Sequence, residues 1–163
     1  MNTYVIIGNG VAGTHAAVHL RKRSPNSSIS LVSEETPYFY SRTALMYIAM
    51  NKMQIEDTEP FERSYYAENN INLIHDTCIN IDIHRKEVNF KKNKTLSYDK
   101  LLLATGSKPA MFGWPGSDLE GVINFVSYQD LQKLQKLLPH VRKATVVGGG
   151  LIGIELVEVL LHY

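Results

Sequence analysis

The sequence predicts an α/β protein whose main sheet is parallel, and three observations support this prediction. Seven of its 11 glycines lie in two short loops, at 8–13 and 148–153. An apolar, β-branched run precedes each loop, and a run of helical character follows it. The first helix then leads into a second β-branched run, which completes the strand–helix–strand unit of a parallel sheet.

The elements of the first part of the chain follow in a regular order. A buried strand at 4–7 precedes the first glycine loop, and a helix at 11–23 follows it and ends before Pro25. A second strand is expected at 29–33. The remaining expected elements are short helices at 43–50 and 60–69, strands at 71–74, 78–83, 87–90 and 100–104, and a small antiparallel excursion across 71–98.

The last part of the chain repeats the opening pattern. Residues 105–121 are rich in proline and glycine and are typical of a connector. Ser127 and Asp130 are spaced as in a capping box, which predicts a helix that ends at Leu138. A strand at 144–147 and a helix at 151–161 are expected on either side of the second glycine loop.

The composition places the chain among ordinary globular proteins. Of 163 residues, 44% are hydrophobic and 20% are charged, which excludes disordered and collagen-like chains. Basic residues number 17 and acidic residues 16, so no charge excess indicates a nucleic-acid or anionic-membrane partner. No apolar run approaches the roughly 18 residues of a membrane span, and the first residues lack the basic region of a secretory signal. We therefore expect a soluble, cytoplasmic protein.

Metal and thiol chemistry are both disfavoured by the residues that they would need. Cys78 is the single cysteine, which excludes an intrachain disulfide and a cysteine-built zinc site. His15 and His19 are four residues apart on the expected first helix, but no third ligand accompanies them. We expect no metal site and assign no catalytic residue.

The first glycine loop carries the clearest functional signal. Gly8, Gly10 and Gly13 fit the pattern G-x-G-x-x-G, with Val11 and Ala12 between the last two. In a strand–loop–helix context the three glycines permit a tight turn, close approach of a pyrophosphate, and close helix packing. The pattern also needs a carboxylate about 20 residues further on, for ribose hydroxyls. Glu34 lies 21 residues after Gly13 and directly after the second strand, next to Glu35. The sequence therefore predicts a dinucleotide site.

The second glycine loop predicts a second dinucleotide. The pattern recurs at Gly148, Gly150 and Gly153, and the candidate binding residues there also include Leu151, Ile152 and Glu155. The confirming strand and carboxylate would lie beyond Tyr163.

With these motifs the chain resembles the two-dinucleotide flavoproteins of the pyridine nucleotide-disulfide oxidoreductase superfamily. The resemblance covers nearly the whole chain. The segments that carry it are the two glycine loops, Tyr40-Ser41-Arg42, and residues 98–107 with their Ala-Thr-Gly at 104–106. The resemblance implies a Rossmann-like domain with FAD on the first loop, NADH or NADPH on the second, and Thr105 and Gly106 on a strand that returns to the FAD domain.

The cysteine pattern points to one branch of the superfamily. Disulfide-reducing members carry a Cys-x4-Cys pair or a lone cysteine near the position where this chain has Arg42. Cys78 lies instead in an expected strand, as a small buried hydrophobe whose backbone, in the resemblance, passes the adenine. The Tyr-x-Arg segment is similar to that of ferredoxin and rubredoxin reductases and of the flavin part of assimilatory nitrite reductase. A departure is Tyr47, which with Met46 occupies the neighbourhood of a lysine found in ferredoxin reductases.

This branch implies a function for the intact protein. Hydride would pass from NAD(P)H to FAD, and electrons would leave singly to a redox acceptor protein or domain, such as an iron–sulfur protein or a nitrite reductase centre. Arg42 would place positive charge near the flavin or its pyrophosphate. The alternatives are an NADH oxidase or disulfide reductase of the same superfamily, or a non-catalytic nucleotide-binding or assembly module.

The resemblance also implies an incomplete protein. We expect residues 1–112 to form most of an FAD-binding domain that lacks a later segment, 113–143 a connector and helix, and 144–163 the first strand and helix of an NAD(P)-binding domain. Apolar side chains crowd the helix at 151–161. Because exposed apolar surface favours association, we expect either a homodimer through this C-terminal unit or docking of the helix onto the FAD domain.

Overall fold

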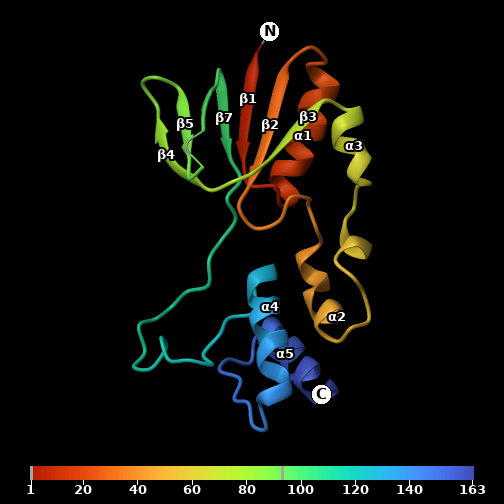
Figure 1. Cartoon of the computed structure of the whole chain (residues 1–163), viewed down its shortest axis with the longest axis vertical. Coiled ribbons are helices and arrows are strands. Elements are labelled where there is room, and N and C mark those ends of the chain that lie inside the picture. Colours follow the sequence, from red (N-terminus) through yellow and green to blue (C-terminus); the bar gives the residue numbers. More distant parts are fainter. Residues whose placement is uncertain (1, 93) are drawn as a thin grey trace. The chain divides into compact units, whose positions relative to one another are not determined.

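The computed structural model describes residues 2–92 and 94–163, which form two compact units (Figure 1). The first unit contains the chain up to Tyr40 together with Glu59–Gly106, and the second contains Ser41–Thr58 and Ser107–Tyr163. No helix among the described residues is long and apolar enough to cross a membrane.

A parallel sheet forms the centre of the first unit. Its strands are β1 (Thr3–Ile7), β2 (Ser28–Ser33), β3 (Ile71–His75) and β7 (Lys100–Leu103), in the spatial order β3-β2-β1-β7. All three pairings are parallel. The carboxyl ends of the four strands therefore meet at one edge, and the first glycine loop leaves the sheet there. The predicted Rossmann-like architecture is confirmed.

A small antiparallel sheet, in the order β4-β5-β6, accompanies the parallel one. It consists of β4 (Cys78–Asp82), β5 (Glu87–Phe90) and β6 (Thr95–Ser97). Two details of the prediction were wrong. Strand β6 was not predicted; it is only three residues long and is defined by its pairing with β5. Residues 71–75 were expected in the antiparallel excursion, whereas β3 pairs in parallel with β2.

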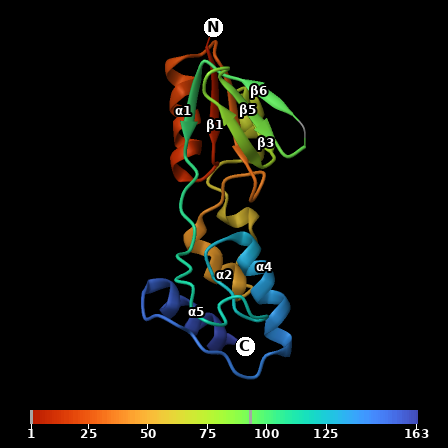
Figure 2. The same ribbon diagram turned by 90° about the vertical axis from the view of Figure 1, so that its left-hand side faces the viewer.

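Helices and the small sheet cover opposite faces of the parallel sheet (Figure 2). On one face α1 (Val11–Arg23) and α3 (Arg63–Glu68) pack over Ile6, Ile29 and Leu31. On the other face β5 packs over Val5, Ile7 and Val32. Neighbouring strand residues alternate between the two clusters because successive side chains of a strand point to opposite faces.

Arg21 ties two loops of the first unit together, the one between α1 and β2 and the one between α3 and β3. Its guanidinium donates hydrogen bonds to five backbone carbonyls, those of Ser24, Pro25, Ser27, Asn69 and Asn70, at 2.7–3.4 Å. The C-terminal end of α1 is thereby held against the turn between α3 and β3.

The second unit is helical in its described residues. Its main helices are α2 (Leu45–Ala49), α4 (Tyr128–Leu137) and α5 (Leu151–His162). Short 3-10 turns lie at Arg42–Ala44, Glu56–Thr58 and Leu138–His140. The predicted capping box is present at the start of α4, where the Ser127 side chain accepts from the Asp130 amide. The buried apolar side chains are Leu45, Met46, Ile48, Ala49, Met50, Phe125, Leu131, Leu134 and Val159.

The strand expected at 144–147 is not formed, so this prediction was wrong. A strand is stabilised by ladder hydrogen bonds to a neighbour, and the described residues of the second unit contain no other strand. The two short helices also differ from expectation. The one expected at 60–69 begins only at Arg63, and a 3-10 turn replaces the start of the one at 43–50.

Helix α5 packs on α2 through its buried face. Val159 is fully buried, and the Tyr163 hydroxyl donates to the Ala49 carbonyl at 2.7 Å. Other apolar side chains of the helix remain exposed, namely Leu151, Ile152, Ile154, Val157 and Leu161. Within the second unit α5 is thus docked on α2. Docking onto the FAD domain and the expected homodimer both stay predictions.

Candidate dinucleotide site

Two glycines of the first loop are required by close backbone packing. Gly8 has φ +106°, and a Cβ there would collide with the Ala104 carbonyl oxygen. A Cβ on Gly13 would collide with the carbonyl oxygen of Gly8. The Gly8 amide donates to Val32 at 2.8 Å, and the Ala104 amide donates to Ile7 at 2.8 Å. The loop is therefore held between β2 and β7.

Gly10 differs from these two glycines because a Cβ there would meet nothing within 4 Å. It is exposed and serves as the N-cap of α1, with no side-chain cap and no acidic residue in the first turn. A helix N-terminus presents unsatisfied amide groups and a partial positive charge. Open space beside uncapped amides, here of Val11, Ala12 and Gly13, fits a pyrophosphate.

The two carboxylates after β2 have different surroundings. Glu35 accepts a hydrogen bond from the Tyr40 hydroxyl at 2.5 Å and is half-buried. Glu34 is exposed, and its carbonyl oxygen lies 3.3 Å from Nε2 of His75. Glu34 follows β2 at the same sheet edge as the glycine loop, as a ribose-binding carboxylate must.

The other candidate residues of the first unit follow β3 and β7. Cys78 begins β4 and is half-buried, with Sγ 3.9 Å from the Asn80 carbonyl oxygen. Burial raises the pKa of the Cys78 thiol, which favours its protonated, unreactive form. Thr105 and Gly106 directly follow β7 and are exposed, and Gly106 has φ +70°. The first unit thus brings its candidate residues to the loops at one sheet edge.

Arg42 belongs to the second unit, where its guanidinium holds two segments together. It is exposed and donates through Nη1 to the Val126 carbonyl at 2.6 Å. This contact links the 3-10 turn before α2 to the residues that precede α4. Tyr47, which lies where the resemblance places a lysine in ferredoxin reductases, is 44% exposed.

The second glycine loop reproduces the geometry of the first. Gly148 has φ +107°, Gly150 caps α5 with an extended backbone, and a Cβ on Gly153 would collide with the Gly148 carbonyl oxygen. Leu151 and Ile152 are exposed, and Glu155 is half-buried. The loop conformation is therefore set by its own glycines, because it forms here without a flanking strand.

Sequence reasoning missed Asn9, which joins the first loop to the turn at 36–38. Its side-chain amide donates to the Thr36 carbonyl at 2.9 Å and lies 3.5 Å from the Pro37 carbonyl oxygen. The residue is 8% exposed. The glycine pattern leaves its second position unspecified. The sequence offers one signal there, an asparagine with a side-chain amide, but it does not show that this amide is buried.

Comparison with known proteins places the whole chain in one family. Residues 2–163 match the family described as "Pyridine nucleotide-disulphide oxidoreductase". Members of this family bind FAD and NAD(P)H.

Two curated relatives illustrate the similarity. An assimilatory nitrate reductase electron transfer subunit of Bacillus subtilis is 33% identical over 97% of this chain and 21% of its own length. A rubredoxin-NAD(+) reductase of Pseudomonas putida is 35% identical over 93% of this chain and 40% of its own length. The chain therefore spans between about a fifth and two fifths of these relatives.

A solved structure agrees with this assignment. The NADH:rubredoxin oxidoreductase of Clostridium acetobutylicum is 28% identical, with a TM-score of 0.87 over 99% of this chain and 42% of its own. The similarity includes both units of the chain.

Proposed function

We propose, because this chain belongs to the pyridine nucleotide-disulphide oxidoreductase family, that it is the N-terminal part of an NAD(P)H-dependent flavoprotein reductase. The whole protein would pass electrons to a one-electron acceptor, such as an iron–sulfur protein or a nitrite reductase centre. The observation that carries the proposal is the first glycine loop, where open space at Gly10 adjoins an uncapped helix N-terminus.

The residues of the first unit have distinct parts in this proposal. Gly10 and the first-turn amides of α1 hold the FAD pyrophosphate, and Glu34 accepts hydrogen bonds from the ribose hydroxyls. The backbone at Cys78 would pass the adenine, and Thr105 and Gly106 would line the site from β7. Bound FAD supplies the chemistry, since a flavin accepts a hydride and releases electrons one at a time.

The second glycine loop is proposed to hold NAD(P). Its glycines have conformations similar to those of the first loop, and the amides at the start of α5 would face the pyrophosphate. The contacts there would come from Gly148, Gly150, Leu151, Ile152, Gly153 and Glu155. By its resemblance to the family segment Tyr-x-Arg, Arg42 would supply positive charge near the flavin or its pyrophosphate.

The domain plan is also a proposal. Residues 1–112 would belong to the FAD domain, 113–143 to a connector and helix, and 144–163 to the start of the NAD(P) domain. A later segment of the whole protein would complete the FAD domain at β7. A groove of about 410 Å³ adjoins that edge strand, with Leu20, Leu101 and Leu102 among its lining residues. We further propose a cytoplasmic location, because the chain carries a single cysteine.

The second candidate function is an NADH oxidase or disulfide reductase. An NADH oxidase of Methanocaldococcus jannaschii is 30% identical over 93% of this chain and 36% of its own length. A thiol relay within this chain is disfavoured, because Cys78 is half-buried in a strand and its pKa is raised. A third candidate, a non-catalytic nucleotide-binding or assembly module, requires only the glycine loop.

Acceptor assays on the whole protein distinguish these candidates. We expect NAD(P)H-driven reduction of a ferredoxin-type or rubredoxin-type protein, with slower turnover on oxygen and on disulfides. Cys78→Ser is expected to leave this activity intact. Loss of turnover in a folded Cys78→Ser variant would contradict the branch assignment, and faster turnover on oxygen or disulfides would favour the second candidate.

A further inference from the structure

We propose that Asn9 is a positioning residue that couples the pyrophosphate-binding loop to the turn carrying the ribose carboxylate. The inference rests on the proposed function, because it assumes that the first loop holds the ADP half of FAD. Asn9 occupies the unspecified second position of the glycine pattern. Its side chain turns away from solvent, since the residue is only 8% exposed.

The hydrogen bonds of Asn9 fix the orientation of its side-chain amide. Nδ2 donates to the Thr36 carbonyl oxygen at 2.9 Å and lies 3.5 Å from that of Pro37. A carbonyl oxygen in place of Nδ2 would face two acceptors, so the nitrogen must point toward the turn. A buried amide without such partners would be costly. The contact therefore requires a side-chain donor at this position.

The backbone of Asn9 is held as firmly as its side chain. The Thr14 hydroxyl donates to the Asn9 carbonyl at 2.8 Å, and Thr14 is fully buried in α1. The first turn of α1, the glycine loop and the turn at 36–38 are thus connected through one residue. Both ends of the connection lie within the first unit.

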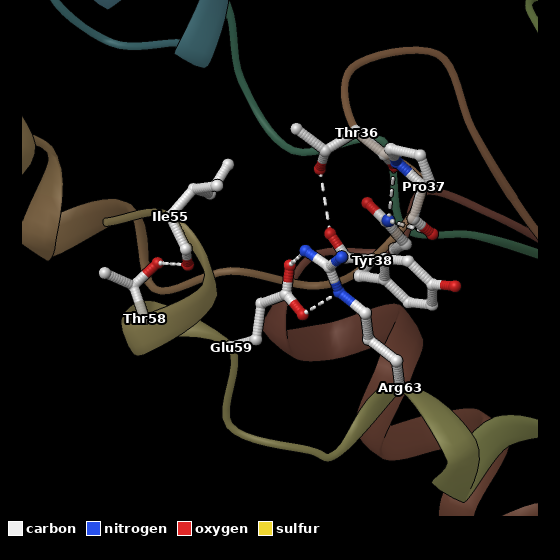
Figure 3. Close-up of polar contacts among 8 residues, drawn as sticks. Thr36, Pro37, Tyr38, Ile55, Thr58, Glu59 and Arg63 are labelled. Atoms are coloured by element: carbon white, nitrogen blue, oxygen red, sulfur yellow. Dashed lines mark hydrogen bonds and ion pairs between the residues drawn. The ribbon is translucent and has the colours of Figure 1, made fainter.

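The turn at 36–38 is itself well ordered by further contacts (Figure 3). Thr36 is 5% exposed, and its hydroxyl donates to the Tyr38 carbonyl at 2.8 Å. The Arg63 guanidinium lies 4.8 Å from the centre of the Tyr38 ring and forms two 2.8 Å hydrogen bonds with Glu59. The turn therefore has a defined conformation to which Asn9 can attach the loop.

The consequence concerns Glu34, which lies two residues before Thr36. The carboxylate must face ribose hydroxyls while the loop amides face the pyrophosphate of the same ligand. A fixed distance between the two groups reduces the ordering cost of binding. Loss of the Asn9 contacts should therefore weaken recognition of the ribose more than recognition of the pyrophosphate.

The test compares two nucleotides that differ only in their ribose hydroxyls. Binding of ADP and of 2′,3′-dideoxy-ADP to the 163-residue chain is measured by calorimetry, for the unmodified chain and for Asn9→Ala. We expect Asn9→Ala to weaken ADP about tenfold, the usual effect of losing a buried hydrogen bond. We expect the affinity for dideoxy-ADP to change by less than about twofold. Asn9→Ser, whose hydroxyl is too short to contact both carbonyls, provides a second variant if Asn9→Ala does not fold.

Asn69→Ala is the matched control. The Asn69 amide also donates to a backbone carbonyl, that of Tyr65 at 2.8 Å, but at the end of α3. The Asn69→Ala variant should bind both nucleotides with affinities within about twofold of those of the unmodified chain. Amide exchange of the ligand-free chain gives an independent readout, and Asn9→Ala should accelerate exchange at 36–38 while Asn69→Ala does not.

The outcomes separate this inference from the proposed function. If the Asn9 variants lowered the affinities for both nucleotides equally, the positioning role would be overturned, while the proposal that the first loop binds a nucleotide would be unaffected. Unchanged ADP affinity would overturn it as well. If the unmodified chain bound neither nucleotide, the proposed function of the first loop would fail, and the inference with it.

Discussion

Gly10→Asp separates nucleotide binding from stability at the first loop. The N-cap position of α1 favours aspartate, which accepts hydrogen bonds from first-turn amides and complements the helix dipole. A Cβ at Gly10 meets nothing within 4 Å, so the variant should fold and gain a few tenths of a kcal/mol. Its carboxylate would, however, compete with the pyrophosphate for the same amides.

The size of the binding loss follows from Coulomb's law. A carboxylate about 5 Å from one phosphate charge, at an effective dielectric of about 20, costs roughly 3 kcal/mol. This corresponds to a loss of more than about 100-fold in FAD affinity. Gly10→Asn is the matched control, because asparagine has the same size and capping ability without the charge.

The assay is a titration of each variant with FAD, followed by flavin fluorescence, with melting temperatures recorded beside it. We expect Gly10→Asn to bind much more tightly than Gly10→Asp, while both melt at or above the temperature of the unmodified chain. Equal FAD affinities for the two variants would refute the assignment of the pyrophosphate to this helix N-terminus.

Three further predictions concern stability. Arg21→Ala should lower the free energy of unfolding, measured by urea titration, by about 3 kcal/mol, because five carbonyls lose a charged donor. The control is Lys22→Ala at the neighbouring exposed position, which should cost under about 0.5 kcal/mol. The raised pKa of Cys78 means that the unfolded thiol ionises first, so stability should fall as pH rises through about 8.5; a Cys78→Ser variant that showed the same fall would exclude the thiol as its cause. Tyr163→Phe removes the hydroxyl that forms hydrogen bonds with Ala49 and Asn51. The rate of amide hydrogen exchange in α5 should then rise by about five- to tenfold. An unchanged rate would show that the hydroxyl does not hold the helix.

Local patterns were sufficient to predict several elements of the first unit. The helix at 11–23 and the strand at 87–90 agree with the structure residue for residue, because a stop signal follows each of them directly in the sequence. The glycine loop is defined by steric limits at Gly8 and Gly13, which a sequence displays directly.

Features that depend on distant partners were not predictable in the same way. Residues 144–147 have β-branched character, but a strand also needs a neighbour to pair with, and the described second unit offers none. β6 escaped prediction for the converse reason, since pairing with β5 alone defines it. Asn9 was missed because its role arises from a turn 27 residues further along the chain.

Thermal unfolding of the 163-residue chain with FAD tests the central claim most directly. FAD at 100 times its Kd should stabilise the chain by about 2.7 kcal/mol, which raises the melting temperature by roughly 5–10 °C for a chain of this size. ADP should also raise the melting temperature, whereas FMN, which lacks the adenylate part of FAD, should not. No shift with FAD or ADP at saturating concentration, together with no flavin eluting with the protein in gel filtration, would contradict the account.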